Sequence, residues 1–146
     1  MKCTNKNPHY KSTVEFYNNA TQTLTATAEP LTLEGTTVTE TGVALDVAGN
    51  AIMINYTGTY AINFSIIADV TTAGDIAIQI YMGGVAIPEA ATTVTVAAGN
   101  NLININTIRF IKAGCQDSNQ IQIIANTDGT AAGSITKVSG NTIKLA

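Results

Sequence analysis

Short apolar runs that alternate with polar or small residues constrain the fold of this chain more than any other feature. The clearest run follows Gly58, and its apolar members share one parity: Tyr60, Ile62, Phe64, Ile66 and Ala68. Successive side chains of a β-strand point to opposite faces, so this run predicts a strand with one buried face. Similar runs recur between Gly, Asn and Asp, and no helical period extends beyond a turn. The pattern predicts an all-β sandwich or barrel of about ten strands.

One turn can be placed from the sequence. Gly83 and Gly84 separate two apolar runs and predict a two-residue hairpin turn, because both turn positions favour residues that tolerate a positive φ. Pro88 is expected to end the strand that follows this turn, since proline cannot donate a ladder hydrogen bond.

The run over residues 102–112 changes phase. Its first two isoleucines, Ile103 and Ile105, share one parity, whereas Ile108 and Phe110 share the other. Either a β-bulge near residues 106–107 restores a single buried face, or a partner covers the second face.

Charged residues are scarce, at 12% of the 146 residues against about 25% in an average soluble domain. No Lys or Arg occurs between Lys11 and Arg109. Either a surface rich in Thr and Asn faces water, or another subunit covers much of the surface, and the second case predicts an oligomer. The net charge of −3 and the missing basic patch argue against binding to nucleic acid or anionic membranes.

Residues 1–18 are polar and aperiodic, and they are predicted to form an extended N-terminal arm ahead of one domain at 19–146. Positive charge gathers in this arm at Lys2, Lys6, His9 and Lys11. Such an arm either docks on an acidic protein surface or frays as an ordinary terminus. It lacks the apolar core of a secretory signal, and no run reaches the ~18–20 apolar residues of a membrane span. Synthesis in a cytoplasm without membrane insertion is therefore expected.

Side chains suited to catalysis or metal binding are few and scattered. His9 is the sole imidazole, and a catalytic triad or a zinc site needs several positioned groups, so His9 is interpreted as a polar residue of the arm. Asp69 and Asp75 bracket a loop that lacks the pattern of a calcium site, and solvated turn acids are favoured over calcium binding or acid-base catalysis. Arg109 is expected to pair with a carboxylate, in its own subunit or across an interface. No enzymatic activity, metal or cofactor is predicted.

The cysteines and tyrosines are also given structural interpretations. Cys3 and Cys115 are expected to be reduced, because their placement suits neither a disulfide framework nor a metal site. Tyr56, Tyr60 and Tyr81 could stack on a carbohydrate, but their strand positions favour packing in the core or at a subunit interface.

The order of these segments resembles the jelly-roll domains of the tumour-necrosis-factor-like and complement globular-head superfamily. The closest similarity is to its bacterial and bacteriophage branch, which is related to the C-terminal domain of collagen-like spore-surface glycoproteins. Residues 17–20 and 58–62 carry this resemblance, the latter as a Gly-x-Tyr strand. Residues 78–88 resemble the family's hairpin before a hydrophobic-Pro pair, and residues 142–145 its last strand near the trimer axis. The collagen-like Gly-x-y stretch of the spore glycoproteins is absent from this chain.

The resemblance implies a jelly-roll β-sandwich that forms a homotrimer, whose core and interface include Tyr60, Ile62, Phe64, Ile143 and Leu145. It implies a non-enzymatic structural protein on a bacteriophage virion, as a head fibre or capsid decoration. We expect residues 1–18 to attach it to the major capsid protein or another virion protein. Outer loops would touch a host surface, with a glycan as the partner considered. The candidate loops are 69–75, 88–92, 98–101 and 113–119.

Three other functions remain open at this point. A receptor-binding module at a tail-fibre tip would bind a host receptor rather than decorate the capsid. A polysaccharide depolymerase would need two carboxylates about 5–9.5 Å apart in a groove. A spore or cell-surface adhesin is the third.

Overall fold

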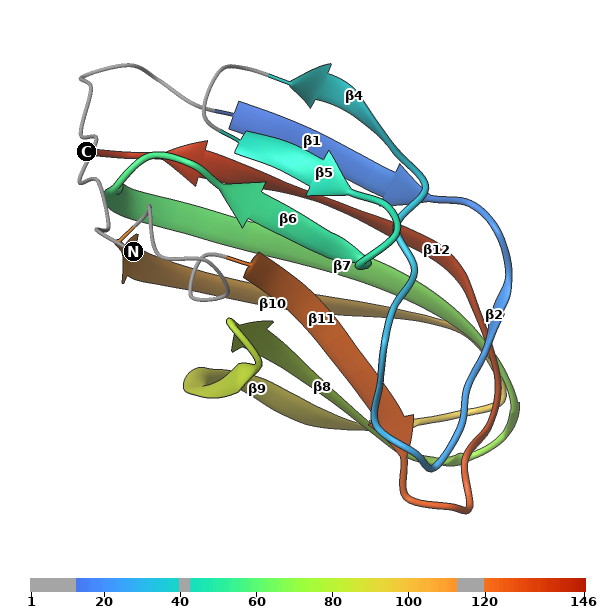
Figure 1. Ribbon diagram of the computed structural model, residues 1–146. Helices are drawn as coiled ribbons and strands as arrows, with labels where there is room; N and C mark the ends of the chain where they lie inside the picture. The colour runs from blue at the N-terminus through green and yellow to red at the C-terminus, as the bar shows by residue number, and fades with distance from the viewer. Residues whose placement is uncertain (1–12, 40–42, 113–119) are drawn as a thin grey trace.

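The protein is described by a computed structural model, which covers residues 13–39, 43–112 and 120–146. These residues form twelve β-strands and no helix, in two antiparallel sheets that stack face to face (Figure 1). The prediction of an all-β sandwich is confirmed. The described part of the chain holds no helix with the length and apolarity that a membrane crossing requires.

Each sheet has six strands. In sheet A the order is β10 (Gly99–Ile111), β7 (Gly58–Thr72), β12 (Ala132–Lys144), β1 (Thr13–Asn18) and β4 (Gly35–Thr39), and β2 (Gln22–Thr23) also pairs with β12. In sheet B the order is β5 (Val43–Asp46), β6 (Ala51–Ile54), β11 (Gln120–Thr127), β8 (Gly74–Met82) and β9 (Val85–Val96), and β3 (Glu29–Pro30) also pairs with β11.

The core lies between the sheets and is built by the inward parity of each strand. The inward residues of β7 are buried as the sequence pattern predicts: Tyr60, Ile62, Phe64, Ile66 and Ala68. Phe64 packs against Phe16 of β1, with ring centroids 4.6 Å apart and planes tilted by 45°. Full burial of each such side chain contributes about 1.5–3 kcal/mol, so β7 anchors sheet A to the core.

The boundary of the predicted N-terminal arm is corrected by β1. Thr13–Asn18 pairs with β12 on one side and β4 on the other, and Val14 and Phe16 are buried. These six residues therefore belong to the jelly roll. Their short length hides the alternation of Val14 and Phe16 in a polar stretch of sequence. Residues 1–12, with Lys2, Lys6, His9 and Lys11, lie outside the described residues.

The strand after the Gly83–Gly84 turn continues past Pro88. The turn itself is confirmed, with φ of 58° and 77° at the two glycines. Strand β9 runs on to Val96, because it is the outer strand of sheet B and a proline there disrupts no ladder to a further strand. The register against β8 shifts between Gln79 and Tyr81, so the extra residues of β9 form a bulge.

The two ends of the sandwich differ in what they carry. At one end, which we call the terminal end, β1 begins at Thr13 opposite Ile143 of β12, close to the C-terminus (Figure 1). The β7–β8, β9–β10 and β11–β12 connections lie together at the other end, which we call the turn end. There the backbone N–H of Asp128 donates to the carbonyl of Asp75 at 3.0 Å. Residues 88–92 are part of β9, and 113–119 lie outside the described residues.

Candidate interface on the outer face of sheet A

The outward side chains of β10, β7, β12 and β1 form one continuous surface, which we call face A. The strand registers align them in rows that cross the sheet. From the terminal end, four of these rows are Ile108, Ala61 and Ile143; Asn106, Asn63 and Asn141; Asn104, Ser65 and Ser139; and Leu102, Ile67 and Lys137. Two polar rows are therefore flanked by an apolar row on one side and a mixed row with two aliphatic residues on the other.

Strand β10 exposes three large apolar side chains on face A. Leu102 and Ile108 are each 65% exposed and Phe110 is 62% exposed. The bulge considered near residues 106–107 is wrong, because β10 pairs with β7 without a register shift. The phase change instead marks a strand with apolar residues on both faces. Ile103, Ile105 and Ile111 point into the core, whereas Leu102, Ile108 and Phe110 are exposed on face A.

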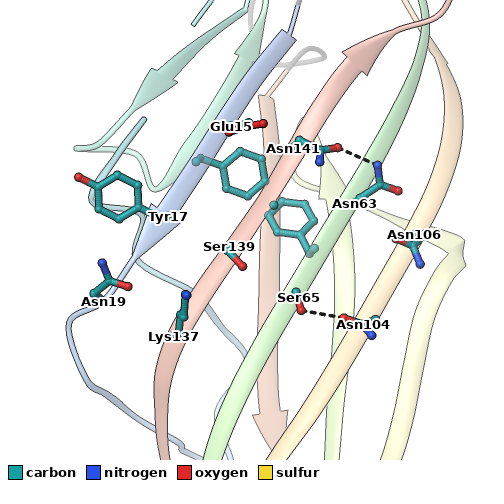
Figure 2. Close-up of a pocket in the computed structure, with 13 residues that line it drawn as sticks. Glu15, Tyr17, Asn19, Asn63, Ser65, Asn104, Asn106, Lys137, Ser139 and Asn141 are labelled. Atoms are coloured by element: carbon teal, nitrogen blue, oxygen red, sulfur yellow. Dashed lines mark hydrogen bonds between the residues drawn. The ribbon is translucent and has the colours of Figure 1, made fainter. Parts of the chain in front are cut away.

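The two polar rows make up a belt across face A, which we call the polar belt: Asn63, Ser65, Asn104, Asn106, Ser139 and Asn141. Neighbouring strands are linked within it (Figure 2). The Nδ2 of Asn63 donates to Oδ1 of Asn141 at 2.8 Å, and the hydroxyl of Ser65 donates to Oδ1 of Asn104 at 2.7 Å.

The belt lines an open hollow of about 680 Å³. Tyr17 and Glu15 of β1 and Lys137 of β12 also line it. Gly140 forms part of its floor, where a Cβ would overlap the backbone carbonyl of Asn63 and lie 2.7 Å from the ring of Phe16. The described residues that line the hollow therefore offer amides, hydroxyls and charges of both signs, and among them Glu15 is the only carboxylate.

The predicted core and interface residues fall into two groups. Tyr60, Ile62 and Phe64 are buried between the two sheets, and of these three only Phe64 lines the hollow in face A. Ile143 is half-buried on face A, and Leu145 is 55% exposed beyond the end of β12.

Tyr60 has no access to the surface, so it cannot take part in the carbohydrate platform considered for the three tyrosines. Its hydroxyl donates to the carbonyl of Tyr56 at 2.7 Å. Burial, with a smaller electrostatic effect from Tyr56, raises the pKa of Tyr60 to about 12. This tyrosine packs in the core, as its strand position favoured.

Arg109 pairs with a carboxylate of its own subunit, which confirms one of the two expected partners. It forms an ion pair with Glu89, and this pair joins the edge strands β10 and β9 of the two sheets. Both side chains are partly exposed, so the contribution to stability is about 1 kcal/mol or less.

Two acidic residues of the turn end, Asp75 and Asp128, have structural partners. Asp75 accepts a hydrogen bond from the hydroxyl of Thr95 at 2.6 Å. The carboxylate of Asp128 accepts the backbone N–H groups of Ala131 and Thr130, which hold its pKa below the usual value. No group of three or more His, Cys, Asp or Glu side chains suited to a metal occurs within residues 13–39, 43–112 and 120–146. Cys3 and Cys115 lie outside these ranges.

Sequence reasoning did not identify the polar belt. Asn104 and Asn106 alternate with buried isoleucines, which is a visible signal of a polar outward face. Asn63 and Asn141 are far apart in sequence, and only the registers of β7 with β10 and β12 place them in one row.

Comparisons with known proteins identify the fold. No family model and no curated protein matches the chain. One similar solved structure is the vertex protein P5 of phage PRD1, with a TM-score of 0.66, 16% identity, and coverage of 92% of this chain and 97% of that chain. Another is the globular domain of zebrafish complement 1qA protein, with a TM-score of 0.69, 9% identity, and coverage of 94% and 98%. Neither is described as an enzyme. The chain therefore has the jelly-roll fold of the tumour-necrosis-factor-like and complement globular-head proteins, as the sequence resemblance implied.

Proposed function

We propose that this chain is a non-enzymatic structural protein of a bacteriophage virion surface, and that it works as a homotrimer assembled through face A. The observation that carries the proposal is the exposure of Leu102, Ile108 and Phe110 along one strand of that face. A soluble protein rarely leaves large apolar side chains aligned in water unless they meet a partner. The likeness to a phage vertex protein supports a place on a virion.

The dimensions of face A suit a stable contact. The strands β10, β7, β12 and β1 have 13, 15, 13 and 6 residues. At about 3.4 Å per residue and a strand spacing of about 4.8 Å, they give a surface of about 770 Å². Stable interfaces bury about 800 Å² on each partner, so face A with its pleated side chains is of the required size. Burial of the exposed parts of the three β10 side chains would contribute on the order of 1–2 kcal/mol each.

The placement of the ends supports attachment at the terminal end. The chain enters the sandwich there at Thr13, directly after the predicted basic arm. The arm, now limited to residues 1–12, would carry Lys2, Lys6, His9 and Lys11 to an acidic virion protein, with avidity from three copies. The turn end then faces outward, toward any host surface that the particle meets.

The oligomeric mass in solution tests the trimer. Sedimentation and native mass spectrometry of the full chain are expected to give three times its mass of 15.2 kDa. Ile108→Lys and Phe110→Lys are expected to yield folded monomers, because each buries a charge in the proposed contact. Val85→Lys, an equally exposed apolar position on sheet B, is the matched control and should remain a trimer. A monomeric wild-type chain would refute the assembly.

Attachment is tested separately on particles. Virions assembled with Lys2, Lys6 and Lys11 changed to Glu are expected to carry fewer copies of the chain, measured by quantitative mass spectrometry of purified particles. Lys112→Glu keeps the arm intact and serves as the control. An unchanged copy number would contradict the role of the arm. Binding of the purified trimer to host cells would instead favour a receptor-binding tip.

A further inference from the structure

Face A contains a feature that a purely apolar contact would not need. The polar belt crosses the middle of the face, and apolar side chains lie on both sides of it along the strands. Burial of the apolar rows against another copy would also take the belt out of water.

Much of the hydrogen-bonding capacity of the belt is unused within one copy. An Asn side chain has two donor hydrogens and an oxygen that accepts two hydrogen bonds. Among the described residues, the Nδ2 groups of Asn104 and Asn141 donate to no neighbour, and the Asn106 amide makes no side-chain hydrogen bond. The hydroxyl of Ser139 has no such partner either.

The unpaired hydrogen-bonding groups of the belt destabilise any packing of two copies that buries them without partners. A buried donor or acceptor without a partner costs about 1–3 kcal/mol, whereas a paired one is stabilising or neutral. Apolar rows alone allow copies to slide past one another with little loss of buried area. A slide of one row would place one of the two polar rows of each copy against Ile or Leu and leave several of its polar groups unsatisfied at once.

We infer that the polar belt is the specificity determinant of self-association: its amides and hydroxyls pair with the belt of the neighbouring copy and fix the register and number of copies. The occupant is a second copy of this chain, because amides carry donors and acceptors together and so suit a partner with the same groups. A single polar layer in an apolar interface sets register and oligomeric state in the same way in coiled coils, at some cost in stability. This inference rests on the proposed assembly through face A.

To test this inference, belt amides are replaced by apolar side chains in the full chain. Asn104→Leu and Asn106→Leu, singly and together, are compared with Thr93→Leu, an exposed strand position on β9 outside face A. Native mass spectrometry and sedimentation over a hundredfold range of concentration report the distribution of states. The thermal midpoint of dissociation reports stability, and circular dichroism confirms folding.

We expect the wild type and Thr93→Leu to give one state, and the double belt variant to give a mixture of states without a lower dissociation midpoint. Asn106→Asp is expected to weaken assembly at least tenfold at pH 7 and to recover at a pH where the carboxyl is protonated, because protonation restores a donor and an acceptor. A wild-type trimer whose belt variants match Thr93→Leu in every distribution would overturn the inference and leave the trimer standing. A monomeric wild type would overturn both.

Discussion

The buried hydroxyl of Tyr60 makes the stability of the fold sensitive to alkaline pH. Its side chain is 0% exposed and its pKa is raised from 10.0 to about 12, first by burial and then by Tyr56. The folded state therefore favours the protonated phenol more than the unfolded state does. This contribution to stability is complete below pH 10 and is lost as the pH rises from about 10 to 12. This increase in the pKa of Tyr60 corresponds to a loss of about 3 kcal/mol in the free energy of unfolding.

Urea unfolding at fixed protein concentration, followed by circular dichroism between pH 8 and pH 12, measures this loss. Tyr60→Phe removes the titrating group, so its free energy of unfolding should fall less steeply above pH 10 than that of the wild type. At pH 8 the free energy of unfolding of this variant should be about 1 kcal/mol below that of the wild type, because the hydrogen bond to the Tyr56 carbonyl is lost. Tyr56→Phe leaves that carbonyl in place and serves as the control. Parallel curves for Tyr60→Phe and wild type from pH 9 to 12 would refute the reasoning.

Three further predictions concern single positions. Gly140→Ala should destabilise the fold by about 1–3 kcal/mol or more in urea unfolding, because the new Cβ would overlap the backbone carbonyl of Asn63 and lie 2.7 Å from the ring of Phe16; an unchanged midpoint would contradict this close packing. Arg109→Ala should lower the free energy of unfolding by about 1 kcal/mol or less, because the ion pair between Arg109 and Glu89 is partly exposed. This difference from the wild type should shrink in 1 M salt, which screens the pair. Asp128→Ala should lower the thermal midpoint at pH 7 and have less effect at acidic pH, because the lowered pKa means that the carboxylate stabilises the turn only while ionised; a pH-independent difference would argue against this.

Much of the sandwich could be predicted because its central strands are regular. The alternation from Tyr60 to Ala68 matches the buried face of β7, and Gly83 and Gly84 adopt the positive φ values that a two-residue turn requires. In both places the residues nearby in sequence determine the geometry, so a local pattern is sufficient.

Other elements depend on neighbours that are remote in sequence. Pro88 does not end β9, because no described strand lies beyond β9 to lose a ladder hydrogen bond. Thr13–Asn18 is a strand because β12 and β4 flank it, although its own sequence is mostly polar. The rows of face A likewise depend on the register between β7, β10 and β12. Of the candidate site, the sequence predicted an oligomer and, as one of two alternatives, a second covered face on residues 102–112. The family resemblance added Ile143 and Leu145 as residues of the core or the interface, and Ile143 lies on face A.

The pairing of β1 with β12 has a consequence for the order of folding. Thr13 lies opposite Ile143, so β1 finds its partner β12 only after the residues between them have been synthesised. During translation, the edges of β1 and of the central strand β7 that face β12 would stay unpaired until β12 leaves the ribosome. Contacts between distant segments also slow folding after release, because a long loop must close first. Strand β12, which follows the other strands of sheet A along the chain, completes that sheet and with it the outer face through which copies would associate.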